Sequence, residues 1–269
     1  MTGPAGPVHP SVRGFDRAAP AYERGRPDYP APAVAWLARE LGLRRGATVI
    51  DLASGTGKLT RALRPTGAAI VAVEPIPGMR AEFARAVPGI VVVPGTAESI
   101  PLPDGFADAV VVAQAFHWFR PGRAVREIAR VLRPRGGVGI VWNTRDDRAA
   151  VSHGISQIVD RYRRGTPPGP GVARRTPDRR SERWRSAFDR PDSPFLPLRH
   201  RTFDHHQRLD STTLVDRVLS VSYIAIQTAA ERRRIAREVR ALLPLGRGDR
   251  PAHTIRLPYR TDVYWSRRR

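Results

Sequence analysis

Short apolar runs alternate with helical segments through the first 145 residues, and this alternation constrains the fold more than any other feature of the chain. The apolar runs, which we interpret as strands, cover residues 47–52, 69–73, 90–93, 107–114 and 138–142. The segments before and between them have helical spacing and are predicted as helices at 31–41, 55–64, 78–86 and 121–132. Strands that are apolar on both faces need helices on both faces, which is typical of a parallel sheet. The pattern therefore predicts a doubly wound α/β fold.

The alternation weakens after residue 150. Helices are predicted at 151–162, 212–221 and 229–243, with an edge strand at 198–206 and a last strand at 253–265. Pro258 in that last strand indicates a sheet edge or a bulge, because proline cannot donate to a strand ladder. The stretch 165–180, rich in proline, glycine and arginine, is expected to be a mobile loop, and residues 1–14 a disordered N-terminus.

The most informative motif lies where the first predicted strand ends. Asp51 is followed by the turn Gly55-Thr56-Gly57 and then by a helix. Glycine lets the backbone approach a ligand where a Cβ would clash, and a helix N-terminus offers free N–H groups. Thr60 stands where a dinucleotide-binding fingerprint has its third glycine, which disfavours a nicotinamide cofactor.

Two further strand ends carry suitable polar groups. Glu74 closes the second strand, where a carboxylate can accept both hydroxyls of a ribose. Residues 96–98 follow the third strand and could border an adenine edge. Three consecutive strand ends of this kind are a more specific signal than the glycines alone.

With these motifs the chain resembles the class I S-adenosylmethionine-dependent methyltransferases, and within them the small-molecule methyltransferase type 11 group. The resemblance covers about residues 15–145 and is carried by residues 51–57, 74–75, 95–101, 115–119 and 126–137, with a less specific match at 257–261. It implies a Rossmann-like, seven-stranded sheet with helices on both faces and a C-terminal cap. The implied organisation is 15–46 as lid helices, 47–145 as the S-adenosylmethionine-binding core, and 146–269 as an acceptor-side cap with the terminal strands of the same domain.

The resemblance also implies roles for individual residues. Asp51 would hold the methionine amino group, and Glu74 the ribose hydroxyls. The other residues implied to bind the cofactor are Gly55, Thr56 and Gly57 at the methionine and ribose, Met79 at the ribose or adenine, Thr96, Ala97 and Glu98 at the adenine, and Gln114 at the methionine. Ala53 stands in the same turn where many relatives have glycine.

The segment 15–30 is similar to the lid segment of this group. Tyr22 and Arg26 could reach the methionine carboxylate, since arginine suits planar carboxylates. The alternative is a surface helix in which Tyr22 covers the core.

His117 follows the fourth predicted strand and faces the side where an acceptor should sit. It is the candidate catalytic residue, because histidine can take a proton near neutral pH. Phe116, Trp118 and Phe119 surround it, so a pocket-wall role is the alternative. His205 and His206 lack a metal-ligand pattern, and no metal site is expected.

The charge is strongly basic, at +21, and Lys58 is the one lysine among 46 basic residues. Arginines with Tyr162 and Trp184 crowd residues 161–190, a composition that can bind RNA or form a solvated cap. The chain has no cysteine, which excludes disulfides and a cysteine nucleophile and fits a cytoplasmic location. Its start lacks a signal-peptide layout, and no apolar run is long enough to predict a membrane span.

The expected function is methyl transfer from S-adenosylmethionine to an oxygen, nitrogen or carbon of a small molecule, as in secondary metabolism. An RNA methyltransferase that uses the basic second half is the first alternative. A cofactor-binding protein without transfer activity is the second.

Overall fold

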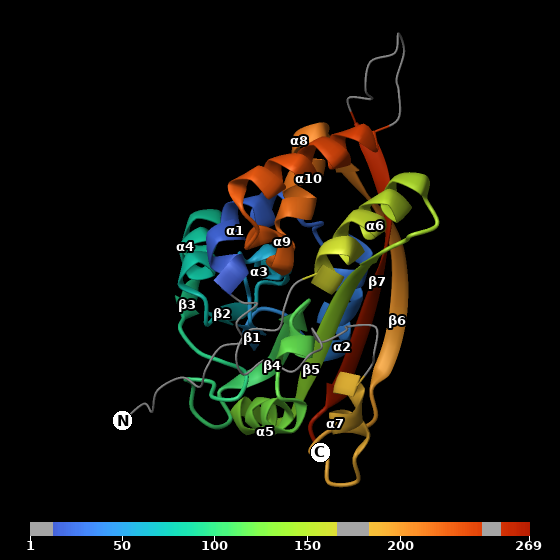
Figure 1. The fold of residues 1–269 in the computed structure, drawn as a ribbon. Coiled ribbons are helices and arrows are strands. Elements are labelled where there is room, and N and C mark those ends of the chain that lie inside the picture. Colours follow the sequence, from blue (N-terminus) through green and yellow to red (C-terminus); the bar gives the residue numbers. More distant parts are fainter. Residues whose placement is uncertain (1–12, 166–182, 244–253) are drawn as a thin grey trace.

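The computed structural model describes residues 13–165, 183–243 and 254–269, which form a seven-stranded sheet with helices on both faces (Figure 1). The strand order is β3-β2-β1-β4-β5-β7-β6. Strands β1 to β5 run parallel, and β7 is antiparallel to both β5 and β6. The predicted doubly wound α/β sheet is confirmed. The strands are β1 (Thr48–Leu52), β2 (Ala69–Val73), β3 (Val91–Val93), β4 (Ala107–Ala113), β5 (Leu132–Arg145), β6 (Arg199–Leu209) and β7 (Ile255–Arg267).

The helices that alternate with the parallel strands lie close to their predicted positions. The first part of the chain contains α1 (Arg13–Gly25), α2 (Ala31–Leu41), α3 (Lys58–Leu63), α4 (Pro77–Ala86) and α5 (Pro121–Val131). The later helices are α6 (Ala150–Gly165), α7 (Ser186–Asp189), α8 (Ser211–Leu219), α9 (Ser222–Ala225) and α10 (Ala229–Ala241). Short 3-10 turns occur at Arg64–Thr66, Phe116–Trp118 and Arg183–Arg185. The predicted mobile loop 165–180 lies almost wholly outside the described residues, as does most of 1–14.

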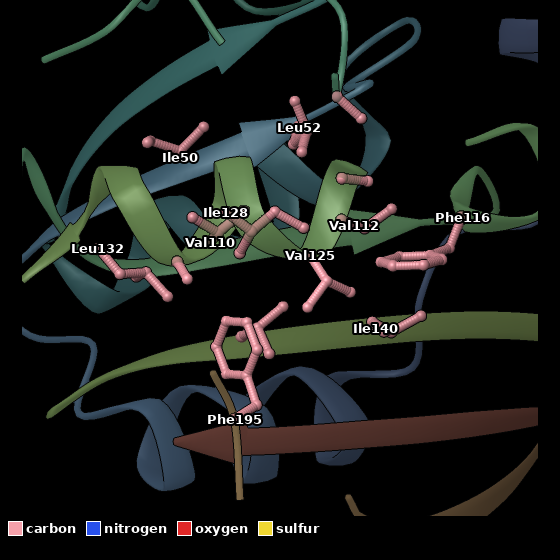
Figure 2. Close-up of a cluster of buried hydrophobic side chains, with 14 of the residues drawn as sticks. Ile50, Leu52, Val110, Val112, Phe116, Val125, Ile128, Leu132, Ile140 and Phe195 are labelled. Carbon is pink, nitrogen blue, oxygen red and sulfur yellow. The ribbon is translucent and has the colours of Figure 1, made fainter. Parts of the chain in front are cut away.

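The two faces of the sheet bury separate clusters because successive strand residues point to opposite sides. On one face, alternate residues of β1, β4 and β5 pack against Val125 and Ile128 of α5 and against Phe195 (Figure 2). On the other face, the intervening strand residues pack against α2. A Cβ on Gly139 of β5 would lie 2.7 Å from Leu37, so the bare backbone at this position lets α2 lie directly on the sheet.

The C-terminal part of the chain completes the sheet and covers one end of it. Figure 1 shows α1, α8, α9 and α10 together at the end where β5 stops and β7 starts. Residues after 150 form a buried cluster of their own, which includes Ile155, Leu214, Val218, Ile235 and Val239. The cap therefore has a core, although its two strands belong to the common sheet.

Pro258 does not mark a sheet edge, because β7 lies between β5 and β6 and the edge strand is β6. The pairing of β7 with β5 reaches only as far as Tyr259, so Pro258 lies just beyond the end of that ladder. Its carbonyl accepts the N–H of Asp146 at 2.9 Å. The backbone nitrogen of Pro258, which carries no hydrogen, faces the same side as this carbonyl. The ladder with β5 has already ended there, so the proline costs no hydrogen bond between the two strands.

Candidate functional site

A pocket opens at the carboxyl ends of β1, β4 and β5, the edge at which parallel sheets bind ligands. It has an empty volume of about 490 Å³, including its open mouth. The lining combines the lid segment, the turn after β1, the ends of β4 and β5, and α8. Its residues are Tyr22, Arg26, Pro27, Tyr29, Ala53, Ser54, Gly55, Thr56, Lys58, Leu59, Ala113, Gln114, Asn143 and Arg217.

The turn between β1 and α3 has a strained backbone. Ala53 has a φ of 56°, in the left-handed region that L-residues avoid at a cost of roughly 1–2 kcal/mol. Gln114, directly after β4, has a φ of 58°. Two non-glycine residues are thus held in the same unfavourable conformation at adjacent strand ends, and both line the pocket. Such strain concentrates at functional sites.

The two glycines of this turn serve different purposes. A Cβ on Gly55 would meet no heavy atom within 4 Å, so the open pocket lies in front of it. A Cβ on Gly57 would lie 2.4 Å from Val87 and 2.8 Å from Phe83. Gly57 is therefore required by the packing of α4 on the turn, and it is not among the residues that line the pocket.

Three polar atoms at the end of β1 are buried without a hydrogen-bond partner among the described residues. They are Asp51 Oδ1, Ser54 Oγ and Thr56 Oγ1, and the last two residues line the pocket. The other carboxylate oxygen of Asp51 accepts from the Thr60 hydroxyl at 2.5 Å. Burial raises the pKa of Asp51 to about 6. Buried polar atoms are rarely left unsatisfied, so this group of orphans is what a polar ligand would complete.

Glu74 lies behind the same turn and fixes its backbone. One carboxylate oxygen accepts from the N–H of Gly55 at 2.9 Å, and the other accepts from the N–H of Ile76 at 2.9 Å. The residue is 3% exposed, and burial raises its pKa to about 7. Each oxygen retains a further lone pair for a hydroxyl donor. Glu74 is not among the pocket-lining residues, and its ribose role stays a prediction.

The residues predicted at the adenine lie outside the pocket lining. Met79 and Ala97 are buried, each 3% exposed. Thr96 pairs with Ser99 in a tight turn. Glu98 accepts the N–H of Arg120 at 2.7 Å, which connects the loop after β3 to the start of α5. No contact of these side chains tests the adenine assignment.

The predicted lid residues do line the pocket. The Arg26 guanidinium lies over the Tyr22 ring, 4.9 Å from its centre. Arg26 also donates through Nε to the Ser220 hydroxyl at 3.2 Å, just after α8. Across the pocket, Lys58 forms an ion pair with Asp28 at 3.0 Å. These contacts fasten the segment around α1 to both α8 and α3.

Sequence reasoning missed a polar group on the far side of the pocket. Asn143, near the end of β5, donates to the backbone carbonyl of Asp28 at 3.1 Å and accepts from the Thr261 hydroxyl at 2.6 Å. The Gln114 side chain donates to the Asn143 carbonyl at 3.2 Å. Asn143 directly follows the predicted strand 138–142, and a polar residue at the carboxyl end of a parallel strand could have indicated a site residue. Arg217 was also missed, because an arginine within a predicted helix resembles an ordinary exposed charge.

His117 lies in the 3-10 turn after β4, between aromatic rings. The centre of its ring is 4.7 Å from that of Trp118 and 5.3 Å from that of Trp142. His117 is not among the residues that line the pocket. Its neighbour Phe116 is fully buried against α7. The catalytic assignment therefore stays a prediction.

The described residues include no group of three or more histidine, aspartate or glutamate side chains placed to hold a metal ion. Within the same ranges, no helix is both long and apolar enough to cross a membrane.

The chain also matches known proteins. Residues 50–140 match the family model described as a methyltransferase domain. An uncharacterized methyltransferase of Mycobacterium tuberculosis is 39% identical over 247 residues, and the match covers 92% of each chain. The chain belongs to the class I S-adenosylmethionine-dependent methyltransferases. A methyltransferase-like protein of Schizosaccharomyces pombe is 33% identical over 219 residues, 81% of each chain.

Solved structures confirm the fold of this methyltransferase. A candidate type II methyltransferase from Anaeromyxobacter dehalogenans superposes with a TM-score of 0.63 at 22% identity, covering 90% of this chain and 97% of that one. The [4+2]-cyclase SpnF superposes with a TM-score of 0.52 at 17% identity, covering 100% and 99%. A protein described by a different reaction shares the fold, so the fold alone does not decide the acceptor.

Proposed function

We propose that this methyltransferase binds S-adenosylmethionine in the pocket at the ends of β1, β4 and β5 and transfers its methyl group to a small molecule. The observation that carries the proposal is the set of orphaned polar atoms on Asp51, Ser54 and Thr56 at the end of β1, where Ser54, Gly55 and Thr56 line the pocket. These groups fit the polar amino-acid and ribose parts of the cofactor.

The residues present can hold the cofactor in distinct ways. Asp51 has a free carboxylate oxygen for the methionine amino group, and Glu74 can accept ribose hydroxyls. Gly55 leaves room for the ligand to approach the backbone. When bound, S-adenosylmethionine would supply a methyl carbon on a positively charged sulfur. An acceptor atom would attack that carbon in line, and the sulfur would leave as a neutral thioether. The protein mainly has to position the acceptor and keep water away.

The cover of the pocket favours a small acceptor. The end of α1 touches α8 so closely that a Cβ on Gly25 would lie 2.3 Å from the backbone nitrogen of Arg217. Arg24 forms an ion pair with Asp216 of α8 at 2.6 Å. A macromolecular acceptor would have to separate these helices, whereas a small molecule would not.

The RNA alternative has less support. Most of the arginine-rich stretch 161–190 lies outside the described residues. Trp184 is buried, at 4% exposure, and packs on Phe116, so it offers no face for a base. The Tyr162 hydroxyl donates to Glu231.

The test is mass spectrometry of reactions that contain S-adenosylmethionine with a deuterated methyl group. Each reaction includes one candidate small molecule or a structured RNA. We expect a labelled small-molecule product from the wild-type chain and none from Gly55→Val, whose side chain would project into the pocket. Label on the RNA, with none on any small molecule, would contradict the proposal.

A further inference from the structure

Arg217 of α8 is a buried charge that lines the pocket. The residue is 5% exposed. Its Nε donates to the Tyr259 hydroxyl at 3.1 Å. Its two terminal amino groups have no hydrogen-bond partner among the described residues, and no carboxylate of those residues pairs with it. Burying an unpaired charge is strongly unfavourable, so such a group is expected to have a partner that the chain itself does not provide.

The surroundings of Arg217 do not offset its charge. Arg145, at the end of β5, is a second largely buried guanidinium, and its acidic partner is Asp147 at 3.3 Å. Burial and then the charge of Arg217 lower the pKa of Arg145. Burial raises the pKa of Tyr259, but Arg217 and Arg145 outweigh it and lower that pKa below its ordinary value. This side of the pocket is therefore positive.

We infer that the methyl acceptor carries a carboxylate group and that Arg217 binds it. The inference rests on the proposed function and specifies its substrate class. A guanidinium binds a carboxylate through two parallel N–H···O bonds, and the bond from Nε to Tyr259 holds the planar group in place for them. A single unpaired arginine matches one carboxylate in charge and in shape. A phosphate usually takes more donors.

The cofactor has a carboxylate of its own, which is the competing source. Arg26 of the lid segment is the residue predicted for it, and Lys58, which also lines the pocket, already pairs with Asp28. Arg217 comes from the cap and stands beside Arg145 at the end of β5. An anionic acceptor would also be attracted by the positive charge that the cofactor carries on its sulfur.

The first experiment separates the two carboxylates by isothermal titration calorimetry. S-adenosylhomocysteine has the amino-acid carboxylate, whereas 5′-methylthioadenosine lacks the amino-acid part. We expect Arg217→Gln to change the affinity for both by less than about threefold. The control is Arg233→Gln, an exposed arginine on α10. A tenfold loss for S-adenosylhomocysteine alone would assign Arg217 to the cofactor and overturn the inference.

The second experiment titrates malonate, succinate, glutarate and citrate, with the amide of each and inorganic phosphate, into the complex with S-adenosylhomocysteine. We expect one or more of the acids to bind at least about tenfold more tightly than its amide. Arg217→Gln should lose this preference, Arg217→Lys should keep part of it, and Arg233→Gln should keep all of it. Tighter binding of phosphate than of every acid, or no preference for acids, would overturn the inference.

A stability measurement excludes a merely structural role for Arg217. Without ligand, Arg217→Gln should unfold at the same or a higher urea concentration than the wild type, because it removes an uncompensated buried charge. Lower stability together with weaker binding of every ligand would contradict the assignment. If the wild type fails to bind S-adenosylhomocysteine, the proposed function falls as well. If the wild type binds S-adenosylhomocysteine but none of the acids, only the assignment of Arg217 to an acceptor carboxylate is wrong.

Discussion

Replacement of Glu74 by glutamine should remove a large part of the pH dependence of stability. The side chain is buried and its pKa is raised from 4.5 to about 7. Between these values the folded chain holds a proton that the unfolded chain has lost. The free energy of unfolding therefore falls as pH rises through this window. Integrated between about pH 5 and about pH 8, the contribution of Glu74 is about 2.5 kcal/mol.

The assay is urea unfolding of the wild type and of Glu74→Gln at both pH values. Asp51 makes a similar contribution to both proteins, so it cancels in the comparison. Glutamine has nearly the shape of glutamate but does not ionise, so the fall in stability should be about 2.5 kcal/mol smaller in the variant. The exposed Asp189→Asn should behave like the wild type. An equal fall in Glu74→Gln and the wild type would refute the reasoning.

Further predictions concern the lid, the turn and the reaction. Binding of S-adenosylhomocysteine near pH 6.5 should release more protons from the wild type than from Glu74→Gln, because ribose hydroxyls favour ionised Glu74. Calorimetry in two buffers with different ionisation enthalpies measures this release, and equal release from the two proteins would show that the ribose assignment is wrong. Ala53→Gly should raise the free energy of unfolding by about 0.5–1 kcal/mol, since glycine relieves the left-handed strain; lower stability in urea would rule this out. Gly25→Ala should force α1 away from α8 and weaken S-adenosylhomocysteine binding by about tenfold; unchanged affinity by calorimetry would show that this contact does not support the lid. His117→Ala should lower turnover by about tenfold to a hundredfold with little change in cofactor affinity; full turnover would remove His117 from the site.

The parallel half of the sheet could be predicted because each of its strands is a continuous apolar run. In β1 and β4 these runs are buried on both faces, so their pattern survives in the sequence without knowledge of the partner strand. The end of β5 nearest α5 was missed: the strand begins at Leu132, whereas the prediction began at Val138. Its first residues include arginines at the surface, and Arg133 pairs with Asp108 at 2.8 Å. This ion pair joins β5 to a residue 25 positions earlier in the chain, so the local sequence pattern around Arg133 does not reveal it.

The position of β7 inside the sheet could not be predicted in the same way. Pro258 indicated an edge or a bulge, and only the register of β7 against β5 shows that the proline falls past the end of their ladder. Register depends on which strands pair, which a local pattern does not specify.

The candidate site likewise contains residues that could be predicted from the sequence and residues that could not. Ala53, Gly55 and Thr56 were predicted from one contiguous motif, and they line the pocket. Arg217 and Asn143 reach the same pocket from distant segments, and neither lies in a motif. The significance of Arg217 follows from its burial and from the lack of a carboxylate partner among the described residues, and that of Asn143 from its hydrogen bonds to Asp28 and Thr261. These are properties of the folded chain.

The central claim is that the pocket at the end of β1 binds the cofactor, and one calorimetric titration of S-adenosylhomocysteine tests it. A Cβ on Gly55 meets only the open pocket, and a Cβ on Gly46 likewise meets no heavy atom within 4 Å. Both glycines have positive φ, at 58° and 87°, so Gly46→Val is a control for backbone strain away from the pocket. We expect S-adenosylhomocysteine to bind the wild type and Gly46→Val but not Gly55→Val. Equal affinity for all three, or no binding to the folded wild type, would contradict it.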